Sequence, residues 1–430
     1  MQDKTKFKQT EIGMIPEDWE IEKIDNLFEI SSGLSKPRNE FGFGHPFLSF
    51  KNIFDNISLP KELYELVNSS ERERKHCSIM RGDVFLTRTS ETIGELGMSS
   101  VALKNYENAT FNGFAKRLRP KRKDIILPEF AVYLFRSSKI RSQILTFSSL
   151  TTRASLNAGM IKEIKLIIPS LPEQSAIANI LSPLDNRIDL NRQTNATLEA
   201  VGQALFKHWF IDFEFPNEKG NPYKSSGGEM IDSELGEIPK GWTVGRLGDI
   251  CDITMGQSPP GNTYNELGDG LPFYQGITDF GFRFPSRRVY CTEPTRFAEA
   301  DDVLLSVRAP VGSLNVAEER CAIGRGVASL RLKGKRNGFL YYLLRATRSG
   351  WEMFEAEGTV FGSVTKSDVH DFKVIIPPRA LIERFAFLIS PWDKTISNKE
   401  KQSRTLTAVR DSLLPKLMSG KIRVCVGGAA

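Results

Sequence analysis

An internal repeat is the strongest constraint on how this chain can fold. Residues 13–19 (GMIPEDW) recur as residues 236–242 (GEIPKGW), 236 − 13 = 223 positions later. Residues 156–206 align without a gap on residues 364–414 at a shorter offset, 364 − 156 = 208. The shrinking offset means that the flanks of the repeat keep their register while its middle differs in length. The sequence therefore predicts two related halves, each with a diverged central part.

Each half ends in the pattern of a long helix. The apolar run at 165–168, stopped by Pro169, predicts a strand, and Ser170 with Glu173 is typical of a capping box at the start of a helix. A seam with alternating steps of four and three follows, which predicts a coiled-coil helix. The seam positions are Ile177, Leu181, Leu184, Ile188, Asn191, Asn195, Leu198, Gly202 and Leu205, then Phe385, Ile389, Trp392, Ile396, Lys399, Ser403, Leu406, Arg410 and Leu413.

Two features interrupt these seams at matching places. Both seams have polar residues in the middle, which lower the stability of a coiled coil but can fix the register of the two helices. Pro183 and Pro391 each remove a backbone hydrogen bond, so we expect a kink or a restart of the helix there. From Pro183 to His208, a helix would run about 40 Å at ~1.5 Å per residue.

The fold class that we predict is α+β. Two globular mixed α/β domains are joined by two long helices packed as an antiparallel coiled coil, with a pseudo-twofold internal repeat. The segments between the helices are too long to be loops, and 40% hydrophobic residues suffice for real cores. The predicted boundaries are 1–155 and 216–363 for the globular domains, and 156–215 and 364–430 for the repeated regions with the long helices.

The motifs of common enzymes are missing from the sequence. It contains neither a P-loop nor a glycine-rich dinucleotide motif. Its four histidines and five cysteines show no metal-ligand spacing, so no metal site is predicted. No apolar run reaches the ~18 residues of a membrane span and the start of the chain is polar, so we expect a cytoplasmic protein. These features argue against an enzyme that acts alone, and no catalytic residue is predicted.

The diverged middles carry polar, glycine-rich loops with residue types that bind DNA. Arginine and lysine neutralise phosphates, arginine forks to guanine, and glutamine or asparagine forks to adenine. A single surface arginine is more often a solvated charge, and a net charge of +6 permits a nucleic-acid partner without requiring one. The candidate DNA-binding residues are Lys36, Arg38, Lys51, Asn52, Arg88, Arg153, Gln257, Tyr274, Gln275, Arg308, Arg325 and Lys366.

The densest positive run, residues 116–123 (KRLRPKRK), has two interpretations that the sequence leaves open. It tracks DNA phosphates, or it is an exposed loop before a helix.

Taken together, the pattern resembles the specificity (S) subunit of type I restriction-modification enzymes across essentially the whole chain. The segments that carry the resemblance are the openings at 13–19 and 236–242, the Ile-Ile-Pro leads at 167–169 and 375–377, and the closing segments 204–213 (ALFKHWFIDF) and 413–422 (LLPKLMSGKI). The family's base-contacting residues follow no shared motif, so the candidate list rests on the loops alone.

The resemblance implies two target-recognition domains, each reading one half of a split double-stranded DNA site. The helices then set the spacing and dock two modification (methyltransferase) subunits, and restriction (translocase and nuclease) subunits join the complex. S-adenosylmethionine, ATP and Mg are expected on those partners, and this chain is expected to bind no cofactor and to do no chemistry. Two alternatives are a coiled-coil interaction scaffold without DNA specificity, and a stand-alone nuclease or methyltransferase.

Overall fold

The computed structural model describes residues 6–90, 95–147, 154–334, 336–352, 354 and 362–424. The chain forms two compact units. Unit 1 is Met1–Ile188 with Arg404–Ala430, and unit 2 is Asp189–Ser403. Both unit boundaries fall inside the long helices, so each unit contains a part of both helices. The four-segment division expected from the sequence is a different one, and its boundaries stay a prediction.

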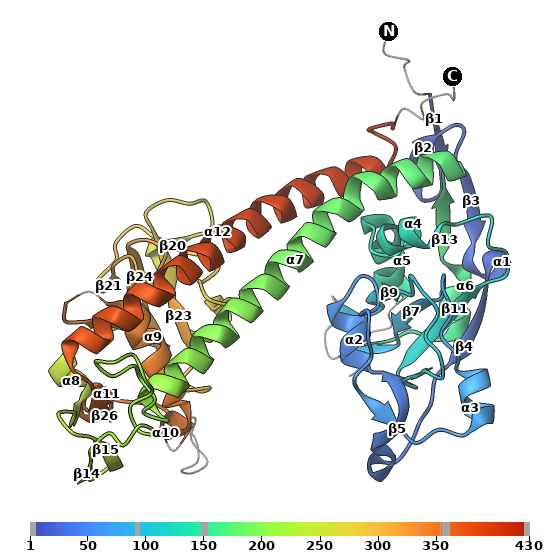
Figure 1. Cartoon of the computed structure of the whole chain (residues 1–430). Helices are drawn as coiled ribbons and strands as arrows, with labels where there is room; N and C mark the ends of the chain where they lie inside the picture. The colour runs from blue at the N-terminus through green and yellow to red at the C-terminus, as the bar shows by residue number, and fades with distance from the viewer. Residues whose placement is uncertain are drawn as a thin grey trace, which may run out of the picture. The chain divides into compact units, whose positions relative to one another are not determined.

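The two long helices are α7 (Leu171–Phe210) and α12 (Arg379–Met418), each of 40 residues. In unit 2, Asn191 donates to the Ser403 hydroxyl (3.2 Å) and Asn195 to the Glu400 carboxylate (3.1 Å), so the residue numbers run in opposite directions. The same order continues in unit 1, where α7 and α12 again lie side by side (Figure 1). The predicted antiparallel coiled coil is therefore confirmed.

The predicted seams face the partner helix. Ile177, Leu181, Ile188, Asn191 and Asn195 are buried, and so are Phe385, Ile389 and Ile396 in the second seam. Neither proline ends its helix, so the predicted restart does not occur. Both prolines are exposed, so water can reach the backbone carbonyl that each of them frees.

The predicted capping box at the start of α7 is wrong. The Glu173 carboxylate accepts hydrogen bonds from the Trp19 indole (2.9 Å) and from Arg423 (2.7 Å). Arg423 also binds Asp18 (2.7 Å), so the N-terminal part of the chain, the start of α7 and the segment after α12 meet in unit 1. Because the buried Glu173 carboxylate binds a cation and an indole, it does not accept the backbone hydrogen bond of a capping box.

Unit 1 contains most of the first half of the chain. Its elements are β1 (Phe7–Thr10), β2 (Gly13–Pro16), β3 (Glu20–Lys23), α1 (Ile24–Leu27), β4 (Phe28–Ser32), η1 (Arg38–Glu40), β5 (Phe41–Leu48), α2 (Phe50–Asp55), β6 (Leu66–Val67), α3 (Glu71–His76), β7 (Val84–Thr87), β8 (Thr89–Ser90), β9 (Ser99–Val101), β10 (Thr110–Phe111), β11 (Ala115–Pro120), α4 (Pro128–Leu134), α5 (Ser138–Phe147), β12 (Ala154–Ser155), α6 (Ala158–Glu163) and β13 (Lys165–Ile168).

Unit 2 contains the second half of the chain and follows a similar order of elements. They are β14 (Met230–Ser233), β15 (Gly236–Pro239), β16 (Thr243–Arg246), α8 (Leu247–Ile250), β17 (Cys251–Met255), η3 (Gly261–Thr263), β18 (Tyr264–Asn265), β19 (Leu271–Tyr274), η4 (Ile277–Asp279), β20 (Tyr290–Cys291), β21 (Phe297–Ala298), β22 (Val303–Ser306), β23 (Leu314–Val316), β24 (Cys321–Ile323), β25 (Val327–Leu332), α9 (Asn337–Ala346), α10 (Arg348–Glu352), α11 (Lys366–Asp371) and β26 (Lys373–Ile376).

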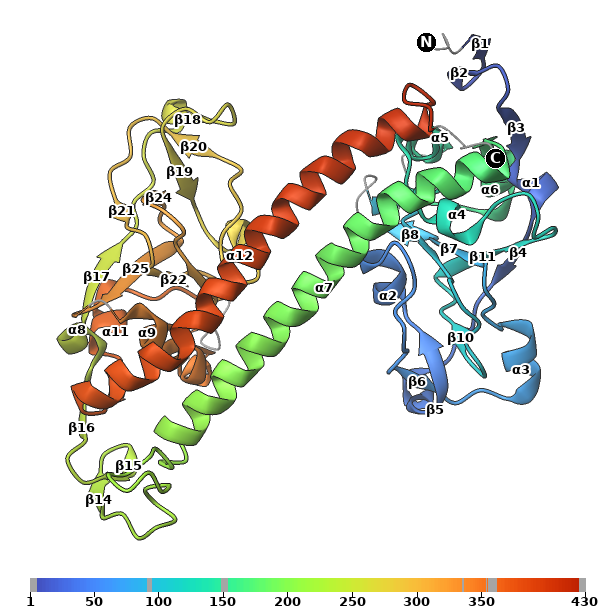
Figure 2. The ribbon, with the colours of Figure 1, turned by 45° about the horizontal axis from the view of Figure 1, so that its top comes forward.

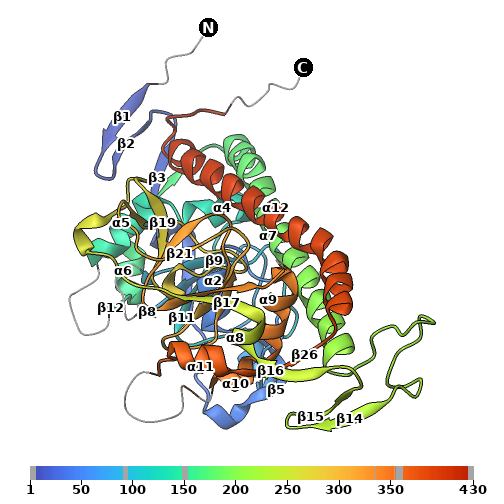
Figure 3. The ribbon, with the colours of Figure 1, turned by 90° about the vertical axis from the view of Figure 1, so that its left-hand side faces the viewer.

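The four-stranded sheets of the two units correspond strand by strand. The order β4-β11-β7-β9 in unit 1 matches β17-β25-β22-β23 in unit 2, and each half of the repeat opens with a hairpin, β1-β2 or β14-β15 (Figure 3). The strand before each long helix, β13 or β26, pairs antiparallel with β3 or β16. A second sheet contains one parallel pair, β5 with β10 or β19 with β24 (Figure 2). The predicted division into two related halves is confirmed.

Residues 116–120 of the basic run are not the exposed loop before a helix that one interpretation expected. These residues lie in β11, the strand between β4 and β7. Arg117 is only 7% exposed and donates to the Ser78 carbonyl (2.6 Å). Arg119 forms two hydrogen bonds with the Asp83 carboxylate (2.8 and 2.6 Å). Arg117 and Arg119 are therefore structural charges whose partners lie within the domain, so neither tracks DNA phosphates.

Candidate nucleic-acid interface

Three loops of unit 2 meet at one end of its sheets. They are 256–260 after β17, 275–276 after β19 and 324–326 between β24 and β25. Backbone hydrogen bonds tie them to one another and to the end of β22, and we call this arrangement the loop cluster. These bonds run from Gln257 N to Ile323 O (3.0 Å), Gly324 N to Tyr274 O (2.8 Å), Gly326 N to Gln275 O (3.1 Å) and Val307 N to Gly326 O (3.0 Å).

Glycine is required where these loops touch. A Cβ atom on Gly256 would lie 2.1 Å from the Gly324 carbonyl oxygen, and one on Gly326 would lie 2.3 Å from the Gln275 carbonyl oxygen. Contacts this short are not possible for other residues. The close approach of the backbones holds the side chains between the glycines in fixed positions.

Unit 1 builds an equivalent loop cluster. Its bonds from Leu34 N to Phe111 O (2.8 Å), Asn112 N to Leu48 O (3.0 Å) and Arg88 N to Phe114 O (2.9 Å) match three of the four bonds in unit 2. A further bond, from Leu156 N to Arg88 O (2.8 Å), matches the one from Val364 N to Val307 O (2.9 Å). A Cβ on Gly33, which corresponds to Gly256, would lie 2.2 Å from the Phe111 carbonyl oxygen. The positions Leu34, Ser49 and Gly113 therefore correspond to Gln257, Gln275 and Arg325.

The exposed side chains of the two clusters differ. In unit 2, the structure brings together four of the predicted residues, Gln257, Gln275, Arg308 and Arg325, and all four are exposed. Within the described residues, the side chains of the two glutamines and Arg308 make no hydrogen bond. Free amides and guanidinium groups on rigid loops are what readout of base edges in the major groove requires.

In unit 1, the cluster presents cations and an aromatic ring. Arg88 is exposed, and Phe114 is 59% exposed. Lys116 donates to the Ser32 hydroxyl (2.6 Å), and its pKa is lowered by burial and by the positive charge of Arg88. Arg88 and Lys116 thus place two positive charges near each other at the cluster, which suits a phosphate group. Lys116 was not among the predicted residues.

The other predicted residues of unit 1 lie outside its cluster. Lys36 forms an ion pair with Glu73 (2.8 Å), and Asn52 closes a capping box with Ser49 at the start of α2. These two side chains are therefore occupied by structural roles. Arg38 in η1 and Lys51 in α2 are exposed, and Arg153 lies outside the described residues.

Two predicted residues of unit 2 also lie apart from the exposed side chains of the loop cluster. Tyr274 is only 4% exposed and packs in a core cluster with Leu304 and Ile323, so its ring is not available to DNA. Its backbone carbonyl nevertheless holds the loop cluster. Lys366 is exposed in the first turn of α11, after the capping residue Thr365.

The sequence contained one signal that would have located the clusters. Residues 39–47 (NEFGFGHPF) recur as residues 265–273 (NELGDGLPF), at an offset of 265 − 39 = 226. Gly44 and Gly270 both have a positive φ, and a Cβ on either would strike a carbonyl of the neighbouring strand, at 2.6 and 2.1 Å. This repeated turn leads into β5 and β19, whose ends carry the loop clusters, so the diverged middles are themselves related.

The part of the chain that the structure describes contains no group of three histidine, cysteine, aspartate or glutamate side chains that could hold a metal ion. No helix among these residues is both long and apolar enough to cross a membrane.

Comparison with known proteins identifies the family. The model of the type I restriction modification DNA specificity domain matches residues 16–200 and 239–408, which is well over half of the chain. The chain belongs to the type I specificity (S) subunit family. The two matched segments correspond to the two halves of the internal repeat, so each half contributes one S-subunit domain.

Relatives in this family match nearly end to end. The MjaX specificity subunit of Methanocaldococcus jannaschii, named as part of a type I restriction enzyme, is 32% identical over 97% of each chain. The MjaIX specificity subunit of the same organism is 28% identical over 98% of this chain and 97% of its own. A solved type I S subunit from M. genitalium has the same fold, with a TM-score of 0.55 at 17% identity over 93% of this chain and 96% of its own.

Proposed function

We propose that this S subunit recognises a split and asymmetric DNA site, with one loop cluster reading each part. The observation that carries the proposal is the duplicated cluster, in which equivalent backbone bonds present different side chains. In unit 2, two glutamines and two arginines suit adenine and guanine edges. In unit 1, the cluster instead presents two cations, Arg88 and Lys116, and the ring of Phe114. Two readers with unlike side chains favour two unlike base blocks.

In this proposal the chain does no chemistry. Modification subunits bind S-adenosylmethionine and methylate the site, and restriction subunits use ATP and Mg to translocate and cut. The chain supplies the choice of sequence, and the helix pair supplies the fixed separation between the two readers.

The first test is duplex binding by the complex of this chain with its modification subunits. Changing either of two separated base blocks is expected to weaken binding, whereas changing the bases between them is not. Affinity is also expected to fall steeply with salt, by roughly 10³–10⁵ between 50 and 200 mM if about six to ten phosphates are contacted. Mapping methylated adenines in the host genome identifies the blocks. Binding that ignores one block, or that does not change with salt, would contradict the proposal.

The docking surface that we propose for modification subunits lies on the long helices. Ile180 and Leu388 occupy equivalent positions, 388 − 180 = 208 apart, and are 38% and 40% exposed. Val201 and Val409 are a second equivalent pair, 43% and 42% exposed. Each unit therefore exposes an equivalent pair of apolar residues, one from each helix: Ile180 and Val409 in unit 1, and Leu388 and Val201 in unit 2. A surface that occurs twice suits two copies of one partner.

The docking surface predicts a change in stoichiometry. Ile180→Glu should remove one modification subunit and Leu388→Glu the other, because a charge at the centre of an apolar contact is desolvated without a partner. The double variant should bind none. The control is Arg192→Ala, which removes an exposed charge from α7. Native mass spectrometry of the complexes measures the outcome, and two bound subunits in the double variant would refute the assignment.

A further inference from the structure

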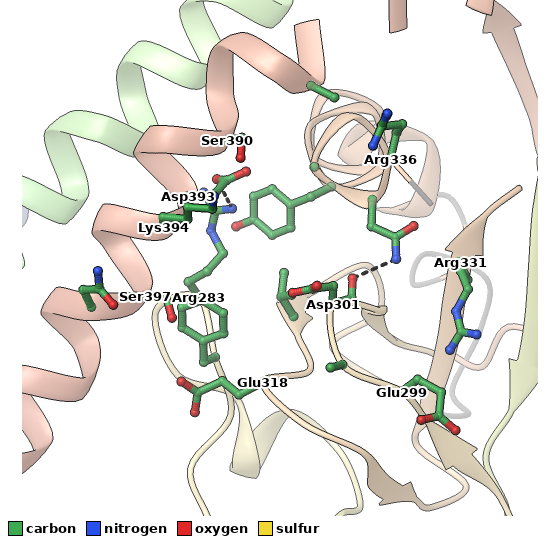
Figure 4. A pocket seen from close by; sticks show the side chains of 18 of the residues that line it. Arg283, Glu299, Asp301, Glu318, Arg331, Arg336, Ser390, Asp393, Lys394 and Ser397 are labelled. Carbon is green, nitrogen blue, oxygen red and sulfur yellow. Dashed lines mark hydrogen bonds and ion pairs between the residues drawn. The ribbon is translucent and has the colours of Figure 1, made fainter. Parts of the chain in front are cut away.

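A buried arginine links the second loop cluster to the long helices. Arg283 lies on the segment between η4 and β20, and its side chain is only 3% exposed. Its guanidinium donates to Glu199 of α7 (3.0 Å) and to Asp393 of α12 (3.0 Å), and it lies over the ring of Tyr341 (3.9 Å). Figure 4 shows Arg283 pointing from its loop toward Asp393. One side chain from the globular part therefore neutralises a carboxylate on each long helix.

The segment before Arg283 is held rigidly and reaches the loop cluster within eight residues. The backbone N–H of Gln275 donates to the buried Asp279 carboxylate (2.7 Å), and Arg288 donates to the same carboxylate (2.6 Å). Asn315 then holds Gly281 through both its N–H (3.0 Å) and its carbonyl (3.1 Å). A shift of Arg283 would thus be passed to Gln275, an exposed residue of the cluster.

The equivalent place in unit 1 is built differently. Asp185 corresponds to Asp393, but its cation comes from α12 itself, through Arg410 (2.7 Å). The position on α7 that corresponds to Arg410 is Gly202, where a Cβ would lie 2.2 Å from the Tyr342 hydroxyl. No side chain fits there, so in unit 2 the helix cannot supply this cation.

The connection between domain and helices also differs in unit 1. Tyr133 of α4, in the globular part, donates its hydroxyl to the Asp185 carboxylate (2.8 Å). The globular part of unit 1 thus gives this carboxylate a neutral hydroxyl, while α12 gives it the cation. In unit 2, the globular part supplies the cation and the helices supply the acceptors.

We propose that Arg283 is a positioning residue, which fixes the angle of the second recognition domain on the helix pair and so fixes the spacer length that the protein accepts. This inference rests on the proposed function. It also implies that the two recognition domains are not interchangeable, because a domain in the second position must bring its own cation. Among the described residues, Arg283 is the cation that pairs with Asp393, and burial already raises the pKa of Asp393.

The test is methylation by the complex with its modification subunits, on duplexes with the natural spacer and with spacers one base pair shorter or longer. The wild-type complex should accept one spacer. In Arg283→Met, the preference for that spacer should fall by about tenfold or more, while the need for the first base block is unchanged. Arg283→Lys should restore part of the preference. The control is Arg287→Met, four residues after Arg283, which removes a surface ion pair between Arg287 and Glu319.

The readout separates positioning from stability, because a variant that is only less stable loses activity on all duplexes alike and keeps their ratio. If Arg283→Met does not fold, Glu199→Gln, which keeps the shape of its side chain, should relax the spacing in the same direction. An unchanged spacing ratio in a folded Arg283→Met variant, or in Glu199→Gln, overturns the inference. A wild-type complex that ignores one base block would instead contradict the proposed function.

Discussion

Lengthening both long helices by seven residues should move the two base blocks about three base pairs further apart and leave the blocks themselves unchanged. The insertions belong after Asn191 in α7 and after Gln402 in α12, two side chains joined by a hydrogen bond (3.0 Å) at the boundary between the units. A heptad preserves the seam and adds about 10 Å at ~1.5 Å per residue. That length corresponds to about three base pairs at ~3.4 Å each.

The measurement is methylation of a library of duplexes with spacers of different length. The natural site should no longer be methylated by the double insertion, whereas a site with the longer spacer should be. The same seven residues placed in the exposed turn at 217–220 should change nothing. An unchanged spacer in the double insertion would mean that the helices do not set the distance.

Removing the reading side chains of unit 2 should abolish recognition of one base block only. Gln257→Ala, Gln275→Ala and Arg325→Ala each delete an exposed group from a backbone that glycines hold in place. Each base contact that is lost should cost about 1–3 kcal/mol of discrimination at one position. The combined variant should therefore lose most of its discrimination within that base block. The rest of the site should be read as before.

The two domains provide the internal control for this prediction. Binding to a panel of duplexes with single base changes shows which block each variant still reads. Arg287→Met, which lies outside the cluster, should behave as the wild type does. Arg88→Ala in unit 1 should alter the other block. Loss of both blocks in the unit 2 variant, without loss of stability, would contradict the assignment of one cluster to each block.

Local patterns predicted the helices of this fold well. The seam from Ile177 to Leu205 reflects burial against one neighbour, and such burial leaves a regular period in the sequence. The capping box failed because Glu173 binds Trp19 and Arg423, which are distant in sequence. A local motif carries no information about partners that only the tertiary structure brings near.

The candidate site was predicted in part for the same reason. Glycine-rich loops identified Gln257, Gln275 and Arg325, because close backbone contacts select glycine next to them. The pattern could not distinguish the exposed Gln275 from the buried Tyr274 beside it, since alternate residues at a strand end face opposite ways. Likewise, Arg117 and Arg119 look like a DNA-binding run until the carbonyl and carboxylate that they bind are known.

The meeting of Asp18, Glu173 and Arg423 bears on how the protein is made. Unit 2 is one continuous stretch, whereas unit 1 needs the last segment of the chain to complete it. On the ribosome, the second domain is synthesised whole while the first still lacks the part of α12 from Arg404 onward and the ion pairs of Arg423. A prematurely terminated chain would therefore carry an unfinished first reader, and only full-length translation products would combine both halves.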